Sequence, residues 1–238
     1  MARLIDEQPD LSVIENRAPS VGHLLRERVA ATPAADAFLY PEGESWTALT
    51  WSQTGDRAYA LAAGLIELGV QPEERVAFAC STRIEWVLVD LAVMCAGAAT
   101  TTIYPSTLSD DVAFIVTDSG SRVVVAEDQE QVAKVLEHRA ELGAVLKIVV
   151  IDGEGDGGDV MTLAELEELG RSRLAAEPGV VDERIDSLTP DHLATIIYTS
   201  GTTGAPRAAR SRTTTSCRWS RTPPNGWPRS STHPVRPT

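Results

Sequence analysis

Helix-length and strand-length patterns alternate along the chain as far as Tyr198. Apolar residues recur at helical spacing after the candidate caps Ser20 and Ser52, and further helices are expected near Ile84–Ala98, from Ser109, and near Gln129–Leu142 and Thr162–Gly170. Short β-branched runs occupy Arg75–Cys80, Thr100–Tyr104, Arg122–Ala126 and Val145–Ile151. Strands that alternate with helices predict βαβ units, a largely parallel sheet and therefore the α/β fold class.

Two acidic clusters have competing interpretations. Asp110 and Asp111 could work as acid and base, but the positive end of a helix dipole already favours carboxylates in the first turn of a helix. Asp152–Asp159 reads DGEGDGGD and has oxygen donors at alternate positions, as at the start of a calcium loop. The position of the bidentate Glu would be Leu163, so we prefer a solvated acidic loop. Residues 171–190 are expected to be connecting sequence.

The stretch Ala194–Arg207 carries the strongest chemical signal in the chain. It reads ATIIYTSGTTGAPR, so that an apolar run ends at Tyr198 and only Thr, Ser and Gly follow as far as Gly204. Glycines allow positive φ, which lets successive backbone N–H groups converge on a phosphate, and the hydroxyls add further donors. No Gly-Lys-Ser/Thr follows, so this is not a Walker A loop. The simpler alternative is a loop that only turns the chain.

The string YTSGTTG at Tyr198–Gly204, followed by Pro206 and a base, resembles the adenylate-forming (AMP-binding) synthetases. These are the acyl-CoA ligases, the luciferases and the peptide-synthetase adenylation domains. In that family a carboxylate attacks the α-phosphorus of ATP, giving acyl-adenylate and pyrophosphate, before a thiol, often that of CoA, takes the acyl group. The resemblance implies that the ATP phosphates are held by Thr199, Ser200, Gly201, Thr202, Thr203, Gly204 and Arg207.

This chain departs from the family pattern at two positions. The family usually has Lys where this chain has Arg207, and Gly where it has Ala208. Arginine keeps the positive charge but replaces a compact ammonium with a broad planar fork. The geometry of the phosphate loop is therefore expected to differ from that of the family.

A longer similarity selects one branch of the family. Ile103–Asp128, IYPSTLSDDVAFIVTDSGSRVVVAED, is similar to the long-chain acyl-CoA synthetases, and the resemblance covers about Ser20–Arg207. It also implies a short pair of strands at Ala37–Tyr40 and Trp46–Trp51. The implied function is ATP-dependent activation of a long-chain fatty acid to acyl-adenylate and then to acyl-CoA. An aryl-CoA ligase or a peptide-synthetase adenylation domain stays open as an alternative.

Charge divides the chain at Pro206. All 34 acidic residues precede Ala205, so that residues 1–206 carry 34 acids against 14 bases, a net charge of −20, whereas residues 207–238 carry seven bases and no acid. Such an acidic body is expected to repel nucleic acid and anionic membranes. We expect an irregular lead-in at 1–19, a partial AMP-binding N-terminal domain at 20–206 and a disordered tail at 207–238.

The composition of the tail indicates a frameshift or a truncation in the gene. Its 32 residues include 7 Arg, 6 Thr, 5 Ser and 5 Pro but no Leu, Ile, Phe or Met, too little apolar surface to offset the entropy of ordering. A GC-rich gene read out of frame gives such a mixture, so we expect a frameshift or truncation within the phosphate loop. The alternative is a basic arm for nucleic acid or an acidic partner, although Trp219 and Trp227 are too few for a stacking platform.

The resemblance also implies groups that this sequence lacks. Adenylation in the family needs an adenine-binding segment, a magnesium-binding Glu, a ribose-binding Asp and a Lys from a mobile C-terminal domain, and none is matched in these 238 residues. We therefore assign no catalytic residue and expect no turnover. The family implies ATP, Mg²⁺ and CoA besides the fatty acid. The competing hypothesis is a catalytically silent α/β fragment with weak or no nucleotide binding.

The remaining signals concern compartment and metals. Three widely spaced cysteines, Cys80, Cys95 and Cys217, fit thiols in a reducing cytosol better than disulfides. The four histidines make no metal-ligand spacing with them, and no resident metal site is expected. The N-terminus lacks a signal-peptide core, and the longest apolar run, Trp86–Thr102, contains Asp90. We expect a cytoplasmic protein without a transmembrane segment, which leaves room for peripheral membrane contact.

Overall fold

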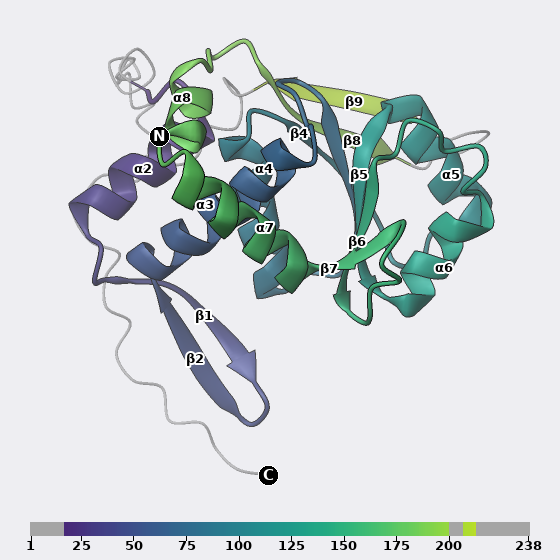
Figure 1. The fold of residues 1–238 in the computed structure, drawn as a ribbon, viewed down its shortest axis with the longest axis horizontal. Helices are drawn as coiled ribbons and strands as arrows, with labels where there is room; N and C mark the ends of the chain where they lie inside the picture. Colours follow the sequence, from purple (N-terminus) through teal and green to yellow (C-terminus); the bar gives the residue numbers. More distant parts are fainter. Residues whose placement is uncertain (1–16, 200–206, 213–238) are drawn as a thin grey trace, which may run out of the picture.

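A largely parallel sheet forms the centre of the protein (Figure 1). The computed structural model describes residues 17–199 and 207–212. The helices in this part are α2 (Val21–Ala31), α3 (Trp51–Glu67), α4 (Ile84–Cys95), α5 (Ser109–Ser119), α6 (Gln129–Glu137), α7 (Leu163–Ala176) and α8 (Val180–Asp186). The strands are β1 (Asp36–Glu42), β2 (Ser45–Thr50), β3 (Arg75–Ala79), β4 (Ala99–Ile103), β5 (Ser121–Asp128), β6 (Lys147–Asp152), β7 (Val160–Thr162), β8 (Leu193–Thr199) and β9 (Arg207–Arg212).

The order of the strands confirms the predicted α/β class. Among the described residues, seven strands lie in the order β7-β6-β5-β3-β4-β8-β9. Each neighbouring pair is parallel except β8 with β9, which is antiparallel. The chain runs from β3 to β4, returns across β3 to β5, β6 and β7, and comes back to β8 beside β4. This route places the strand that leads to Ser200 next to β4, not next to the strand that precedes it in sequence.

Helices cover both faces of the sheet, with α3, α4 and α7 on one face and α5 and α6 on the other (Figure 1). Successive strand residues point to opposite faces, so β5 contributes Val123 and Val125 to one core and Val124 and Ala126 to the other. The first core joins the sheet to α3, α4, α7 and α8. The second joins it to α5 and α6.

Helices α3 and α7 touch at the level of the backbone. A Cβ atom added at Gly170 would overlap the carbonyl of Ala60 and the amide of Gly64, and one added at Gly64 would overlap the carbonyl of Leu166. Only glycine permits an approach this close. The contact ties the segment that follows the sheet edge at β7 back to the first long helix, and so supports the return of the chain to β8.

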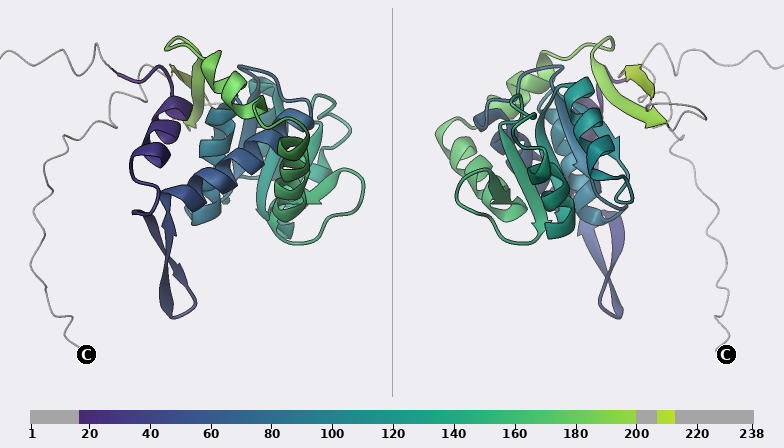
Figure 2. Two further views of the ribbon diagram at one scale, coloured as in Figure 1. Left: turned by 60° about the vertical axis from the view of Figure 1, so that its left-hand side comes forward. Right: turned by 90° about the vertical axis from the view of Figure 1, so that its right-hand side faces the viewer.

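The hairpin of β1 and β2 projects from the body (Figure 2). Its strands pair antiparallel in a sheet of their own, as the family resemblance implied. Trp46 of β2 is 70% exposed, whereas Phe38 packs against Trp51 at the start of α3, with ring centroids 5.9 Å apart. The hairpin is therefore anchored at its base.

Several predicted element ends differ from the structure. Thr50, not Ser52, caps α3, through a capping box with Gln53, because Thr50 keeps extended backbone angles while Ser52 already lies inside the helix. Ser109 is likewise the first residue of α5, and the N-cap is Leu108, whose side chain accepts no hydrogen bond. The connecting sequence expected at 171–190 instead contains the last part of α7 and all of α8, whose Val181 and Ile185 are buried in the first core.

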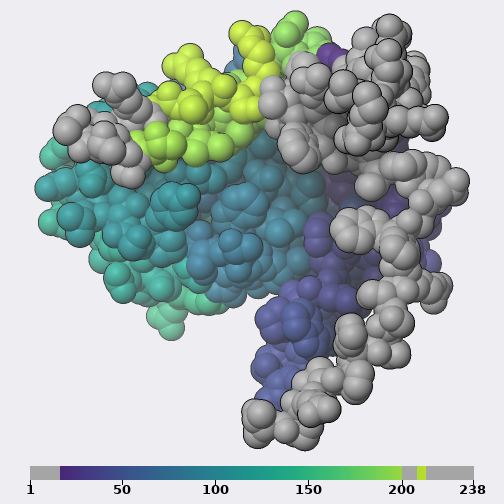
Figure 3. All heavy atoms as spheres, turned by 180° about the vertical axis from the view of Figure 1, so that it is seen from behind, coloured from purple at the N-terminus to yellow at the C-terminus, as the bar shows by residue number. Residues whose placement is uncertain are grey.

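The beginning of the predicted disordered tail is a strand. Arg207–Arg212 forms β9 along β8, at the edge of the molecule (Figure 3). A ladder of backbone hydrogen bonds with a strand that is already in place does not need large apolar side chains, and composition alone therefore missed this element. Residues 213–238 and 1–16 lie outside the described residues, and so do the expectations made for them.

Candidate phosphate-binding site

Strand β8 leads to the predicted phosphate loop. Its side chains alternate, with Ala194, Ile196 and Tyr198 buried while Ile197 is 44% exposed. It pairs with β4 on one side and with β9 on the other, and Thr199 lies opposite Arg207 in the antiparallel register. Residues 200–206 therefore connect two adjacent antiparallel strands.

The structure places the two ends of the predicted site. Thr199 is the exposed last residue of β8, and the backbone of Arg207 begins β9. The antiparallel register places these two positions opposite one another, although they are not neighbours in sequence. The other predicted residues, Ser200, Gly201, Thr202, Thr203 and Gly204, lie outside the described residues. The assignment of the phosphate-binding residues stays a prediction.

A cavity of about 220 Å³ opens beside Tyr198, at the carboxyl ends of β4 and β8. The start of α5 closes one side of it through Leu108, Asp111 and Ile115. Tyr104 and Leu108 stand at its rim, 73% and 71% exposed. The other lining residues are Thr102, Ile103, Ser106 and Thr107. A concave, partly apolar space with hydroxyl groups therefore lies beside Tyr198. Such a space has the usual composition of a ligand site.

Tyr198 links β8 to helix α5. Its hydroxyl donates to Oδ2 of Asp118 at 2.6 Å, and its ring is buried between the sheet and the helix. Burial, and next the hydrogen bond to the Asp118 carboxylate, raise the pKa of Tyr198 above its ordinary value. The hydroxyl therefore remains a proton donor at neutral pH.

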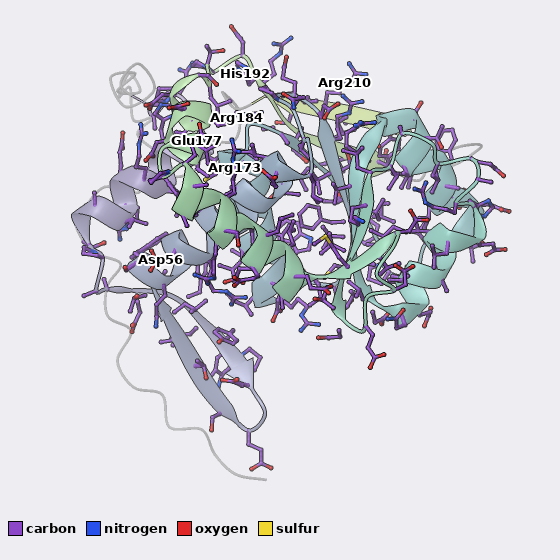
Figure 4. The ribbon with its side chains drawn as sticks, in the orientation of Figure 1. Asp56, Arg173, Glu177, Arg184, His192 and Arg210 are labelled. Atoms are coloured by element: carbon purple, nitrogen blue, oxygen red, sulfur yellow. The ribbon has the colours of Figure 1, made fainter. Side chains whose placement is uncertain are left out.

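The edge strand β9 carries positive charge alongside the middle and the start of β8, where Arg210 lies opposite Ile196 and Arg212 opposite Leu193. Arg210 of β9 extends into solvent (Figure 4). Arg212 donates to the carbonyl of Asp191 at 2.7 Å, and so fastens the end of β9 to the residues that precede β8. The hairpin thus combines a backbone ladder with an arginine clamp.

A second crevice lies where the strand order reverses, between β3 and β5, and in parallel α/β sheets such a crevice often binds ligands. Here charged side chains that bond to one another line a cavity of about 600 Å³, together with residues of β1. The amide and hydroxyl of Ser81 donate to Glu127 at 2.9 and 2.5 Å, and Arg83 pairs with Glu85 at 2.6 Å and also with Asp152 and Glu127. These partners satisfy one another, so we do not place the ligand here.

The remaining candidate groups are metal ligands and cysteines. Within residues 17–199 and 207–212, no cluster of three or more His, Cys, Asp or Glu side chains could hold a metal ion. Asp156 of the acidic loop accepts from the amides of Gly158 and Val160 at 2.7 and 2.8 Å. Cys80 and Cys95 are buried free thiols, as expected, whereas Cys217 lies outside the described part.

A family model described as AMP-binding enzyme matches residues 25–213. The chain belongs to the AMP-binding enzyme family. The match includes the predicted phosphate loop and β9, so this AMP-binding family member continues to resemble the family to the end of the β8–β9 hairpin. No helix among the described residues is long and apolar enough to cross a bilayer.

Relatives of this AMP-binding family member include enzymes of different specificity. A long-chain-fatty-acid–CoA ligase of Mycobacterium bovis is 34% identical over 165 residues, which make up 69% of this chain and 26% of that protein. The phosphinothricin tripeptide synthetase of Streptomyces viridochromogenes is 33% identical over 192 residues, 80% of this chain and 14% of that protein. The chain thus spans about a quarter of the ligase. The acetoacetyl-CoA synthetase of Streptomyces lividans shares the fold, with a TM-score of 0.67 and 20% identity over 82% of this chain and 30% of that one.

Sequence reasoning missed three features of this AMP-binding fold at the site: strand β9, the cavity and the bond between Tyr198 and Asp118. The six residues of β9 show no apolar alternation, so no local pattern predicts a strand there. Tyr198 and Asp118 are 80 residues apart in sequence. The only prior signal was that both lie in strings that resemble the family.

Proposed function

We propose that this chain carries the triphosphate-binding part of an ATP-dependent long-chain fatty acid–CoA ligase. The single observation that supports this proposal is that Tyr198 and Thr199, which begin the YTSGTTG string, end strand β8 beside an open cavity. Thr199, Ser200, Gly201, Thr202, Thr203 and Gly204 would hold the β- and γ-phosphates through backbone amides and hydroxyls. Arg207 would supply positive charge to the same phosphates.

The intact reaction that we propose has two steps. A fatty-acid carboxylate attacks the α-phosphorus of ATP, the bond to the bridging oxygen breaks, and pyrophosphate leaves. The CoA thiol then attacks the acyl carbon and AMP leaves. The long-chain specificity rests on the 34% identity with the Mycobacterium bovis ligase and on the similar string at Ile103–Asp128. A peptide-synthetase adenylation domain is the second candidate, because the tripeptide synthetase is 33% identical over a longer stretch.

We further propose that the 238-residue chain does not turn over by itself. Phosphoryl-type chemistry depends on positioning and on neutralisation of charge. Among the described residues, no group of three or more His, Cys, Asp or Glu side chains could hold a metal ion. A phosphate loop without the groups that hold adenine, ribose and metal is expected to bind the triphosphate weakly and to leave the α-phosphorus unactivated. We propose a cytoplasmic location for the protein.

Isothermal titration with ATP, AMP and pyrophosphate tests the phosphate assignment. We expect saturable binding of ATP and pyrophosphate, weaker binding of AMP, and about tenfold weaker binding of ATP by Arg207→Ala. Arg207→Lys restores the usual family residue and should bind at least as well as the natural chain. Thr202→Val tests a loop hydroxyl, and Thr47→Val on the distant β2 is its control.

A second assay tests turnover. Pyrophosphate release is measured with ATP, Mg²⁺, palmitate and CoA. We expect none above background, and sustained release would disprove the proposal that the chain is silent. Failure of both ATP and pyrophosphate to bind at millimolar concentration would disprove the phosphate-binding role.

A further inference from the structure

Tyr198 occupies the last position before the predicted phosphate-binding residues. It is 7% exposed, and its side chain points to the α5 side of the sheet, where it joins the second core. Thr199 follows it directly and points to the other side. Any displacement of the Tyr198 ring would therefore move the first residue of the loop.

The partner of Tyr198 lies on a fixed support. Asp118 belongs to the last turn of α5, and this turn is tied to the start of β3 by Arg75. The guanidinium of Arg75 donates to the carbonyl of Gly120 at 3.2 Å and also to the carbonyl of Ser119. Arg75 thus satisfies carbonyl groups that the end of a helix leaves without partners. The carboxylate of Asp118 is held in place by helix and sheet together.

The bond between Tyr198 and Asp118 is of the stronger kind. A hydroxyl that donates to a carboxylate is charge-assisted, and such bonds are roughly twice as strong as bonds between neutral groups. Removal of the carboxylate would leave a largely buried hydroxyl that seeks another partner. The ring would then shift toward water, and the end of β8 would shift with it.

We propose that Asp118 is a positioning residue, which acts through Tyr198 to hold the end of β8 and thereby the starting point of residues 199–207. The inference rests on the proposed function, because a fixed starting point matters most where amides must converge on phosphate. The bond is distinct from the loop contacts themselves, since Asp118 and Tyr198 both precede the residues that are proposed to hold the phosphates.

The chain contains a matched control for this bond. The hydroxyl of Tyr59 in α3 donates to Oδ1 of Asp182 in α8 at 2.9 Å, on the face of the sheet opposite α5. Burial, and next the bond to Asp182, raise the pKa of Tyr59 in the same direction as that of Tyr198. Tyr59→Phe therefore removes the same kind of bond with a similar loss of stability, but without a connection to β8.

Hydrogen exchange of the protein without nucleotide is the first test. In Tyr198→Phe and Asp118→Ala we expect amides of residues 196–209 to exchange about fivefold faster or more, as the loss of one hydrogen bond implies. Tyr59→Phe should leave that segment unchanged. Asp118→Asn keeps an acceptor and should restore most of the protection.

Titration with Mg²⁺-ATP is the second test. Asp118→Ala and Tyr198→Phe should each weaken the binding of Mg²⁺-ATP about five- to tenfold. The double variant should bind no more weakly than either single variant, because both substitutions remove the same bond. Equal exchange in all the variants, or the same increase with Tyr59→Phe, would overturn the inference. If residues 196–209 exchange faster in Asp118→Ala and Tyr198→Phe than in the natural chain, but the natural chain binds no ATP, the positioning role is supported and the proposed function is refuted.

Discussion

The carboxyl ends of β3 and β5 and those of β4 and β8 belong to one sheet, yet they are built in opposite ways. Between β3 and β5, Ser81, Arg83 and Glu127 bond to one another and to neighbouring carboxylates. Beside β4 and β8 there is a cavity of about 220 Å³, rimmed by exposed apolar side chains. We call the first the closed end, because its charged groups bond to one another although a cavity of about 600 Å³ opens beside them, and we call the second the open end.

This difference shows that strand topology alone does not locate a ligand site. The reversal of strand order lies between β3 and β5, where the general rule for parallel sheets would place the ligand. Side-chain chemistry favours the other end, because the charged groups beside the cavity between β3 and β5 already bond to one another. Tyr198 and Thr199, the first residues of the AMP-binding string, lie at the open end.

The largest expected effect concerns the thiol at the closed end. Burial, and next the carboxylate of Glu127, raise the pKa of Cys80 to about 12. The thiolate is the nucleophile, so at pH 8.5 iodoacetamide should modify Cys80 more than about 100-fold more slowly in the folded chain than in urea. Peptide mass spectrometry over time measures this ratio. Rapid modification of Cys80 in the folded protein would show that solvent and reagent reach this thiol.

The same shift has a consequence for stability. Because the folded state raises the pKa of this acidic group, the folded state holds its proton more tightly than the unfolded state does. The associated stability is present below the ordinary thiol pKa and is lost as the pH rises from there toward about 12.

The next effect concerns the ion pairs of the closed end. Arg83→Ala leaves Glu85, Glu127 and Asp152 without their shared cation, and we expect a loss of about 1–3 kcal/mol in the free energy of unfolding. Urea denaturation measures it. The control is Arg171→Ala, which removes only an i,i+4 pair with Glu167 and should cost less than about 0.5 kcal/mol. Equal losses in both variants would mean that the cluster is an ordinary surface feature.

The smallest effect concerns the open end and has the opposite sign. Leu108 is the N-cap of α5 with extended backbone angles, and its exposed side chain caps nothing. Leu108→Ser should therefore raise the free energy of unfolding by about 0.5–1 kcal/mol, whereas Leu108→Ala should change it little. A gain would indicate that this end is not optimised for stability, as is common at functional sites. A loss of stability with serine would contradict the comparison.

Local patterns predicted most of the scaffold. Apolar spacing placed the helices that became α2, α3, α4 and α6, and β-branched runs placed β3, β4, β5 and β6 to within a few residues. Element ends were less accurate, as Thr50 and Leu108 show, because a cap is decided by backbone geometry that several neighbouring Ser and Thr residues could supply. Helix α8 was missed because it is short and its apolar positions are few.

The sequence by itself determined the α/β class, the family and the string that is proposed to bind phosphate, because these depend on neighbouring residues. Only the tertiary structure decided that β8 lies beside β4, that Arg207–Arg212 pairs with it, and that Asp118 holds Tyr198. The first and the third of these contacts join residues far apart in the chain, and the second needs β8 to be in place before β9 can pair with it. Their stability comes from burial and pairing that exist only after the sheet has formed, so no local pattern could indicate them.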